Sequence, residues 1–244
     1  MPVGEFLFVC GAILVIAFLY SSVGHAGASG YIAVLTLFGF APEVIRPIAL
    51  VLNVLVATIG FVQFRRAGHF SWQLFWPFAV LAVPLAFVGG YVTLPTEWLK
   101  LLLGVVLLAS AVQFVRRPTP DGDVRPPATG VAVPVGGALG LLAGLTGTGG
   151  GIFLTPLLIF LRWARTKQAS AVSALFILVN SLAGLAGNVS ATRDFPSVAL
   201  SFAAVAAFGG VMGSHMGARR LDVTAIKRLL AVVLTIAGIK LVLA

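Results

Sequence analysis

The sequence predicts an all-α polytopic membrane protein with two inverted-topology repeats. Each repeat is expected to hold a glycine-tipped re-entrant or broken-helix hairpin followed by three transmembrane helices. Three observations lead to this prediction. The 244 residues are 59% hydrophobic and only 9% charged, a composition outside the range of soluble globular domains. Long apolar runs follow one another along the chain, and a glycine-rich break interrupts each half.

The apolar runs are separated by short polar or glycine-rich segments. They cover roughly 5–21, 31–40, 44–64, 73–93, 97–115, 128–143, 152–161, 168–188, 196–217 and 223–243. Glu5 is the only charged residue before Glu43 and no Lys or Arg precedes Arg46, so the start of the chain lacks the basic segment of a cleaved signal peptide, and residues 5–20 are taken as a membrane helix. Cys10 is the only cysteine, which excludes an intrachain disulfide and a cysteine metal cluster.

The middle of the chain divides it into two similar halves. A proline-rich polar segment at 118–127 separates a first transmembrane repeat, 1–117, from a second, 128–244. Each half begins with an apolar run, a glycine-rich break and a short apolar run, and continues with a run that carries one asparagine, Asn53 or Asn180. This order indicates an internal duplication.

The orientation of the two copies depends on the broken segment at 5–40. A single broken crossing gives parallel copies, and a hairpin that returns to its own side gives inverted ones. The model with a hairpin places 12 of the 16 Lys and Arg residues on one side of the membrane and 4 on the other. The model with a single crossing divides the same residues 9 to 7. About 35 residues also span roughly 52 Å as a helix, too long for one crossing of a core about 30 Å thick. Inverted copies are therefore favoured, with both termini outside and the linker cytoplasmic.

The glycine-rich breaks are the strongest functional signal in the sequence. The second break runs from Gly144 to Gly151, and a weaker counterpart runs from Ser22 to Gly30. Glycine weakens helices, and broken backbone survives in a bilayer only where protein or a water-filled cavity covers it. Each break is therefore a close-packing seam or a binding site. If the short helices begin near Ser29 and Gly150, their amino-terminal N–H groups create a site for an anion.

The candidate ligands lie in the breaks and at mid-depth in two helices. An amide such as that of Asn53 or Asn180 needs a partner in the membrane. Contact with substrate is one explanation, and an amide that caps broken backbone or joins two helices is an equally good one. His25 suits a substrate ligand, a proton carrier or a histidine bonded to loop backbone. The predicted substrate-binding residues are His25, Gly27, Ser29, Gly30, Asn53, Thr146, Thr148, Gly149, Gly150, Gly151 and Asn180.

The sequence offers no signature of an enzyme. It has no HExxH, GxSxG or Walker motif and no carboxylate pair within a span, so we expect no catalytic residue, resident metal or cofactor. The net charge of +9 comes from short basic clusters between apolar runs, which favours topology signals over nucleic-acid binding. Arg46 is expected near the outer opening of the transport path. There it either attracts anions or extends its charged group to the membrane surface. The expected partners are the lipid bilayer and a small anion; proton or ion coupling and a homo-oligomer remain open.

Both breaks and both asparagine segments resemble the sulfite exporter (TauE/SafE) family. In the first half the resemblance lies in Ser21–Tyr31 and Leu50–Asn53, and in the second in Gly147–Pro156 and Val179–Ser181. It implies transport of sulfite, sulfonates or related small anions across the bacterial inner membrane. The first break has His25 where the second is a nearly pure glycine run, so the copies need not contribute equally.

The resemblance and the helix-end argument together favour an exporter of small sulfur-containing anions that works by alternating access. An anion channel of the same fold is the first alternative, because the same helix-end site serves a pore. An intramembrane enzyme or a structural subunit is the second.

Overall fold

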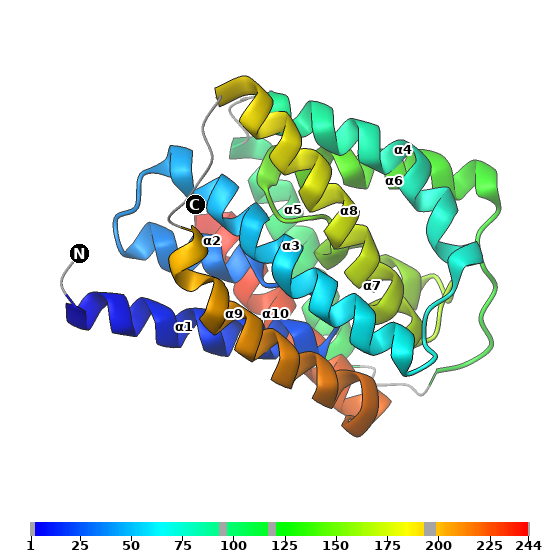
Figure 1. Ribbon diagram of the computed structural model, residues 1–244. Coiled ribbons are helices and arrows are strands. Elements are labelled where there is room, and N and C mark those ends of the chain that lie inside the picture. Colours follow the sequence, from blue (N-terminus) through cyan, green and yellow to red (C-terminus); the bar gives the residue numbers. More distant parts are fainter. Residues whose placement is uncertain (1–2, 93–96, 117–120, 193–198, 244) are drawn as a thin grey trace.

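The computed structural model describes residues 3–92, 97–116, 121–192 and 199–243, and in this part of the chain the regular structure is helical throughout. Figure 1 shows the helices gathered in one bundle. In chain order they are α1 Val3–Ser22, α2 Ala28–Leu37, α3 Pro42–Arg66, α4 Trp72–Tyr91, α5 Glu97–Arg116, α6 Thr129–Thr146, α7 Gly151–Phe160, α8 Thr166–Thr192, α9 Ala199–His215, the π-helical turn η1 Met216–Arg220 and α10 Val223–Leu243. Each predicted apolar run overlaps one of these helices within the described residues, which confirms the all-α class.

The helices fall into two length classes. Six described helices, α1, α3, α4, α6, α8 and α9, are long and apolar enough to cross a bilayer. Helices α2 and α7 have only ten residues each. At about 1.5 Å per residue each short helix spans roughly 15 Å, half of a hydrocarbon core about 30 Å thick. The short second arms therefore have the length that the sequence predicts.

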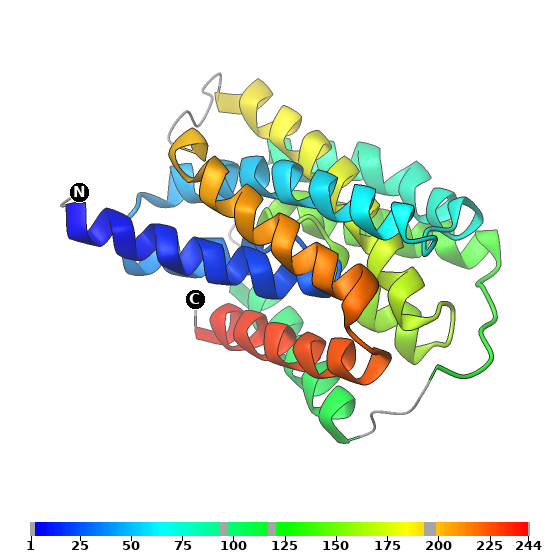
Figure 2. The same ribbon diagram turned by 60° about the horizontal axis from the view of Figure 1, so that its bottom comes forward.

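Equivalent helices of the two halves take part in equivalent contacts. Helix α1 packs beside α9, and α6 packs beside α4, as both views show (Figures 1 and 2). The first helix of each half thus lies against the fourth helix of the other half. Helices α3 and α8, which carry Asn53 and Asn180, pack against each other, and α5 packs against α10.

Glycines bring several helix backbones into direct contact. A Cβ atom at Gly136, Gly140 or Gly144 on α6 would overlap the backbone of α4. Gly209 and Gly213 on α9 approach the backbone of α1 in the same way. Because lipid is as apolar as these side chains, association rests on such close van der Waals contact rather than on the hydrophobic effect. The glycines explain why α4 with α6 and α1 with α9 are among the most extensive helix contacts.

The terminal helices and the described part of the linker mark the two ends of the bundle. The start of α1 and the end of α10 lie at one end, and the described part of the linker, 121–127, lies at the other (Figures 1 and 2). The boundary predicted at 117–118 falls outside the described residues. So do Arg117 and Arg193, two of the charges used to predict topology.

Candidate functional site

Two short loops interrupt the helices at the positions of the predicted breaks. One joins α1 to α2 and ends at Gly27, and the other joins α6 to α7 and ends at Gly150. Both glycines are left-handed, with φ of 101° and 78°, and no side chain caps the helix that follows. The first N–H groups of α2 and α7 therefore lack both an intrahelical acceptor and a side-chain cap, and they carry the positive end of the helix dipole.

The second loop lies against the asparagine of α3. A Cβ atom at Gly149 would lie 3.0 Å from Nδ2 of Asn53 and 2.8 Å from Oγ of Ser181. Asn53 Nδ2 donates to that serine oxygen at 3.3 Å, while Asn53 Oδ1 has no hydrogen-bond partner. The structure thus brings Asn53 and Gly149 together, and it adds Ser181 of α8 as their common neighbour.

Asn180, the residue before Ser181 on α8, has a fully buried side chain. Neither Oδ1 nor Nδ2 of its amide has a hydrogen-bond partner. Burial of an amide without partners costs free energy, and native proteins avoid it outside functional positions. The Asn180 amide therefore neither caps broken backbone nor joins two helices by a hydrogen bond, whereas Asn53 joins α3 to α8 through Ser181.

The first loop is bonded to α7 through His25. Its Nε2 lies 2.8 Å from Oγ1 of Thr155, which in turn donates to Oγ of Ser173 at 2.7 Å. The imidazole ring also contacts the backbone of Gly151. His25 of the first half thus lies beside the start of α7 in the second half. The sequence analysis gave no role to Thr155, although a hydroxyl one turn after a glycine break is a usable signal.

Three other candidates of the first break make contacts within their own half. Ser29 lies 2.8 Å from the hydroxyl of Tyr20. A Cβ atom at Gly27 would lie 2.8 Å from the Tyr31 hydroxyl, and one at Gly30 would lie 2.6 Å from Ile16. Close packing of α1 on α2 accounts for glycine at Gly30, while Gly27 also requires its positive φ.

The threonines of the second break are paired with each other. Thr146, the last residue of α6, donates to the carbonyl of Leu142 at 2.7 Å. Its hydroxyl also lies 2.9 Å from that of Thr148, a buried residue in the loop. These bonds stabilise the end of α6. The remaining glycine, Gly151, is the first residue of α7 and faces Ile177 and Ser173 on α8.

Arg46 is half-buried and hydrogen-bonded to helix ends rather than extended into a mouth. Its Nη2 donates to the carbonyls of Gly89 at 2.6 Å, Gly90 at 2.9 Å and Gly144 at 2.6 Å. These carbonyls belong to the last turns of α4 and α6, where the helix dipoles are negative. Arg46 therefore joins α3 to both helix ends, next to the second glycine loop, where a Cβ atom at Gly147 would lie 2.8 Å from its Cγ.

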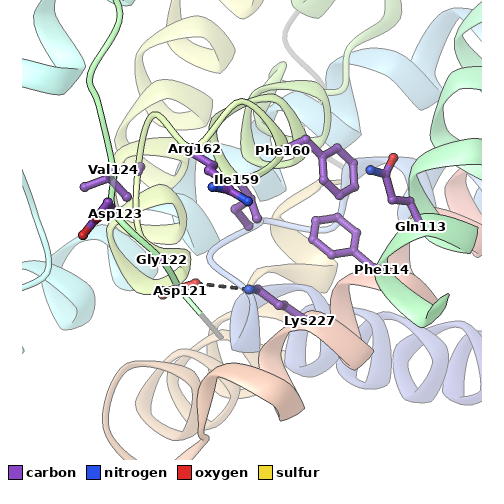
Figure 3. Close-up of a pocket in the computed structure, with 11 residues that line it drawn as sticks. Gln113, Phe114, Asp121, Gly122, Asp123, Val124, Ile159, Phe160, Arg162 and Lys227 are labelled. Carbon is purple, nitrogen blue, oxygen red and sulfur yellow. Dashed lines mark ion pairs between the residues drawn. The ribbon is translucent and has the colours of Figure 1, made fainter. Parts of the chain in front are cut away.

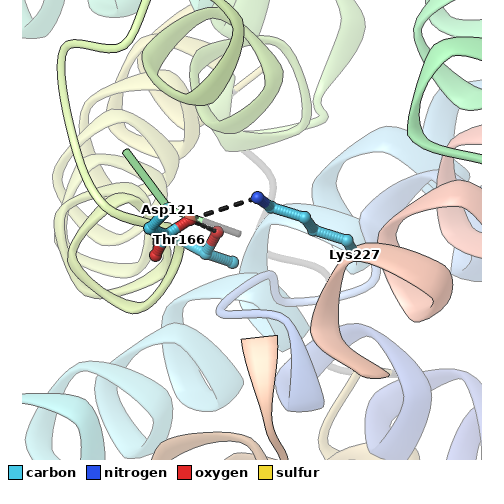
Figure 4. A network of polar contacts seen from close by, with 3 residues as sticks. All are labelled: Asp121, Thr166 and Lys227. Atoms are coloured by element: carbon cyan, nitrogen blue, oxygen red, sulfur yellow. Dashed lines mark hydrogen bonds and ion pairs between the residues drawn. The ribbon is translucent and has the colours of Figure 1, made fainter. Parts of the chain in front are cut away.

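A separate polar cluster lies at the linker end of the molecule, beside a pocket of about 270 Å³ (Figures 3 and 4). Asp121 accepts hydrogen bonds from the backbone N–H of Thr166 at 2.8 Å and from its hydroxyl at 2.6 Å. The ammonium of Lys227 lies 3.1 Å from the same carboxylate. Partial burial acts to raise the pKa of Asp121, but the bonds from Thr166 and Lys227 outweigh it and hold this pKa below its ordinary value. The cluster fastens the linker to α8 and α10.

Comparison with known proteins identifies the family. The family model described as "Sulfite exporter TauE/SafE" matches residues 9–241. The chain belongs to this family. Relatives with similar sequences include "Probable membrane transporter protein y4hK" of Sinorhizobium fredii (strain NBRC 101917 / NGR234), 37% identical over 94% of this chain and 95% of the relative. "Probable membrane transporter protein YunE" of Bacillus subtilis (strain 168) is 22% identical over 77% of this chain and 75% of the relative. No solved structure matches.

The TauE/SafE match confirms the resemblance on which the sequence analysis relied. Together with the six membrane-length helices, it makes the chain a multi-pass membrane protein of a transporter family.

Proposed function

We propose that this TauE/SafE protein is a secondary transporter, in the export direction, of small sulfur-containing anions such as sulfite or organosulfonates. The anion binds at the amino-terminal ends of α2 and α7. Transport is the activity of the family, and the family description supports sulfite as the type of substrate. The two helix starts, which no side chain caps, supply the positive end charge that an anion needs.

The observation that carries this proposal is the unsatisfied amide of Asn180. Its Nδ2 donor is fully buried and unpaired, on the helix that also contacts Gly149 through Ser181. Sulfite and sulfonates present oxygen acceptors that such a donor and the first N–H groups of α7 can bind together. Hydrogen bonds to an ionised acceptor contribute about 1.5–3 kcal/mol each, more than neutral ones. A bound anion would therefore satisfy Asn180 where the protein does not.

The glycine loops suit this role because they admit close approach of an anion to the backbone. Gly149 and Gly150 both have positive φ, which L side chains rarely adopt. Between Gly147 and Gly151, Thr148 is the only residue that is not glycine. The rest of the proposed set comprises His25, Gly27, Ser29, Gly30, Asn53, Thr146 and Gly151.

Binding measurements test the site directly. Purified protein should bind at least one of sulfite, sulfate, thiosulfate and ethanesulfonate, and Asn180→Leu should abolish that binding in folded protein. Asn188→Leu is the matched control, because Asn188 is also buried on α8, eight positions further along. Unchanged binding by Asn180→Leu would place the anion elsewhere. If neither variant accumulates in the membrane, Asn180→Ala and Asn188→Ala repeat the comparison with smaller side chains.

Counterflow separates a carrier from a channel. In vesicles loaded with unlabelled substrate, a transporter with alternating access accelerates uptake of labelled substrate from the opposite side. An open anion channel shows no such acceleration. Equal uptake with empty and loaded vesicles would therefore favour the channel.

The proposed arrangement in the membrane has inverted halves, both termini outside and the linker in the cytoplasm of a bacterial cell. A membrane-impermeant thiol reagent tests it in a Cys10→Ala background. A cysteine at Gly122, which is exposed in the linker, should stay unlabelled in intact cells, while one added at the carboxyl terminus should react. The reverse pattern would overturn this topology.

A further inference from the structure

His25 is a titratable group that lies beside both helix starts of the proposed site. It lies two residues before Gly27, the residue that precedes α2, and its ring contacts Gly151, the first residue of α7. The side chain is 3% exposed. We propose that Nδ1 of His25 is a proton-binding site whose occupation is linked to anion binding. This proposal rests on the proposed function, because the linked anion is the transported one.

The hydrogen bonds around the His25 ring decide which of its two nitrogens can accept a proton. Thr155 uses its single hydroxyl hydrogen to donate to Ser173, so its oxygen acts as an acceptor toward His25. His25 Nε2 must then carry the hydrogen in the neutral ring, and Nδ1 carries the lone pair. Nδ1 has no hydrogen-bond partner and is buried. The structure therefore holds an unpaired basic nitrogen beside two helix starts.

Among the described residues, no carboxylate makes a hydrogen bond or an ion pair with His25. The sequence of α7 has no titratable residue. Other elements that pack around the loop or on its helices carry these titratable groups: Glu5, Cys10 and Tyr20 on α1, Tyr31 on α2, Glu43, Arg46, Arg65 and Arg66 on α3, Lys167 on α8, His215 on α9, Arg219 and Arg220 on η1, Asp222 after η1, and Lys227, Arg228 and Lys240 on α10. Glu5 lies in the first turn of α1, five turns from the loop, and Asp121 of the linker is paired with Lys227. Glu43 is exposed in the first turn of α3, which follows the end of α2 away from the loop. Asp222 is exposed and accepts a hydrogen bond from the backbone N–H of Ala225.

This electrostatic setting makes proton and anion binding interdependent. An unpaired charge in a membrane interior is costly, and the helix starts add to the positive potential. A protonated His25 therefore needs the anion as its counter-charge. By linkage, the bound anion raises the affinity for the proton to the same extent that the proton raises the affinity for the anion. The neutral ring becomes an imidazolium when the anion arrives and loses the proton when it leaves, so one proton travels with each anion.

Proton uptake on binding is the test. Ethanesulfonate and sulfate are the probes, because neither changes its own charge appreciably between about pH 5.5 and 8. In weakly buffered detergent solution with a pH-indicating dye, each binding event should take up as much as one proton. The affinity should fall by up to about tenfold per pH unit in the upper part of this range. His25→Gln should bind the probe without proton uptake and with an affinity that varies little with pH.

The matched control is His69→Gln, which alters a histidine bonded to the carbonyl of Ala218. It should retain the proton uptake of the natural protein. Anion binding without proton uptake in the natural protein overturns this proposal and leaves the proposed function intact. So does proton uptake that persists in His25→Gln. If sulfite, thiosulfate and both probes fail to bind the natural protein, the proposed function fails and this proposal fails with it. Because the decisive measurement uses the natural protein, a variant that does not fold leaves the test complete.

Discussion

Arg46 Nη2 donates to the carbonyl oxygen of Gly144 at 2.6 Å, and this bond joins the helix of Asn53 to the last turn before the second glycine loop. The same nitrogen binds Gly89 and Gly90 at the end of α4. One cation thus satisfies three carbonyls at two negative helix ends. Its position fixes α3, α4 and α6 relative to the loop that follows α6.

Replacement of Arg46 by methionine should destabilise the protein. The variant leaves half-buried helix-end carbonyls without a donor, at a cost of about 1–3 kcal/mol for a buried unsatisfied group. The measurement is the unfolding midpoint in detergent, with Arg66→Met, an exposed arginine of the same helix, as the control. Equal midpoints for the two variants would show that the Arg46 bonds do not hold the helix ends together.

Gly140→Ala should destabilise the pairing of α6 with α4. The added Cβ atom would overlap the carbonyl oxygen of Ala82, and backbone cannot yield as a flexible side chain does. Overpacking of this kind costs about 1–3 kcal/mol, against which the better helix propensity of alanine returns only about 1 kcal/mol. Gly130→Ala on the same helix is the control, because nothing lies within 4 Å of its added atom. A midpoint for Gly140→Ala at or above that of Gly130→Ala would contradict the close packing.

Asp121 should make stability depend on pH in the acid range. Its pKa in the folded protein is lowered, so its contribution is complete above the unfolded value of about 3.9 and is lost as pH falls through the folded value. Asp121→Asn should remove the contribution at pH 7, by about 1 kcal/mol for a partly solvated ion pair, and flatten the acid dependence. Unfolding midpoints between about pH 2 and 7 provide the measurement.

The control for Asp121 is Asp123→Asn, since Asp123 lines the same pocket and is exposed (Figure 3). It should leave the acid dependence of the natural protein in place. If both variants show the same profile as the natural protein, the bonds from Thr166 and Lys227 to Asp121 do not contribute to stability.

Local sequence signals predicted the helices and the positions of the two breaks. A glycine cluster within an apolar run shows where a helix stops, and α7 begins at Gly151, one residue from the predicted start near Gly150. An asparagine within an apolar run shows a polar position at mid-helix, and both Asn53 and Asn180 are fully buried. Such signals need only the residue and its neighbours in sequence.

Contacts between distant segments could not be predicted in the same way. His25 and Thr155 are 130 positions apart, and no local pattern relates them. Arg46 was expected to attract anions at a mouth or to snorkel, yet its partners are backbone carbonyls, which every residue possesses and no sequence motif marks. The inverted relation of the halves and the substrate contacts stay predictions, since they depend on the membrane and on the bound anion.

Gly150→Ala should weaken anion binding more than any single hydroxyl change at the second loop. Gly150 has φ of 78°, where alanine is strained by about 1–2 kcal/mol, and its Cβ would lie 2.9 Å from Cε1 of Phe176. The loop must therefore shift, which moves the first N–H groups of α7 away from the proposed anion. Thr148→Val keeps the loop backbone and loses one neutral hydrogen bond, about 0.5–1.5 kcal/mol, so its affinity should fall by roughly 2- to 13-fold at most.

Gly39→Ala separates backbone strain from an effect on the site. Gly39 also has a positive φ, 71°, but nothing lies within 4 Å of the added atom, and it follows α2 at the end away from the glycine loop. This variant should lose about as much stability as an alanine substitution at any other glycine with positive φ, and it should still bind anions at full affinity. Isothermal titration with the anion that binds the natural protein compares Gly150→Ala, Thr148→Val and Gly39→Ala. If Gly150→Ala binds as tightly as Gly39→Ala, the second loop is a packing seam, and the backbone of α7 does not hold the anion.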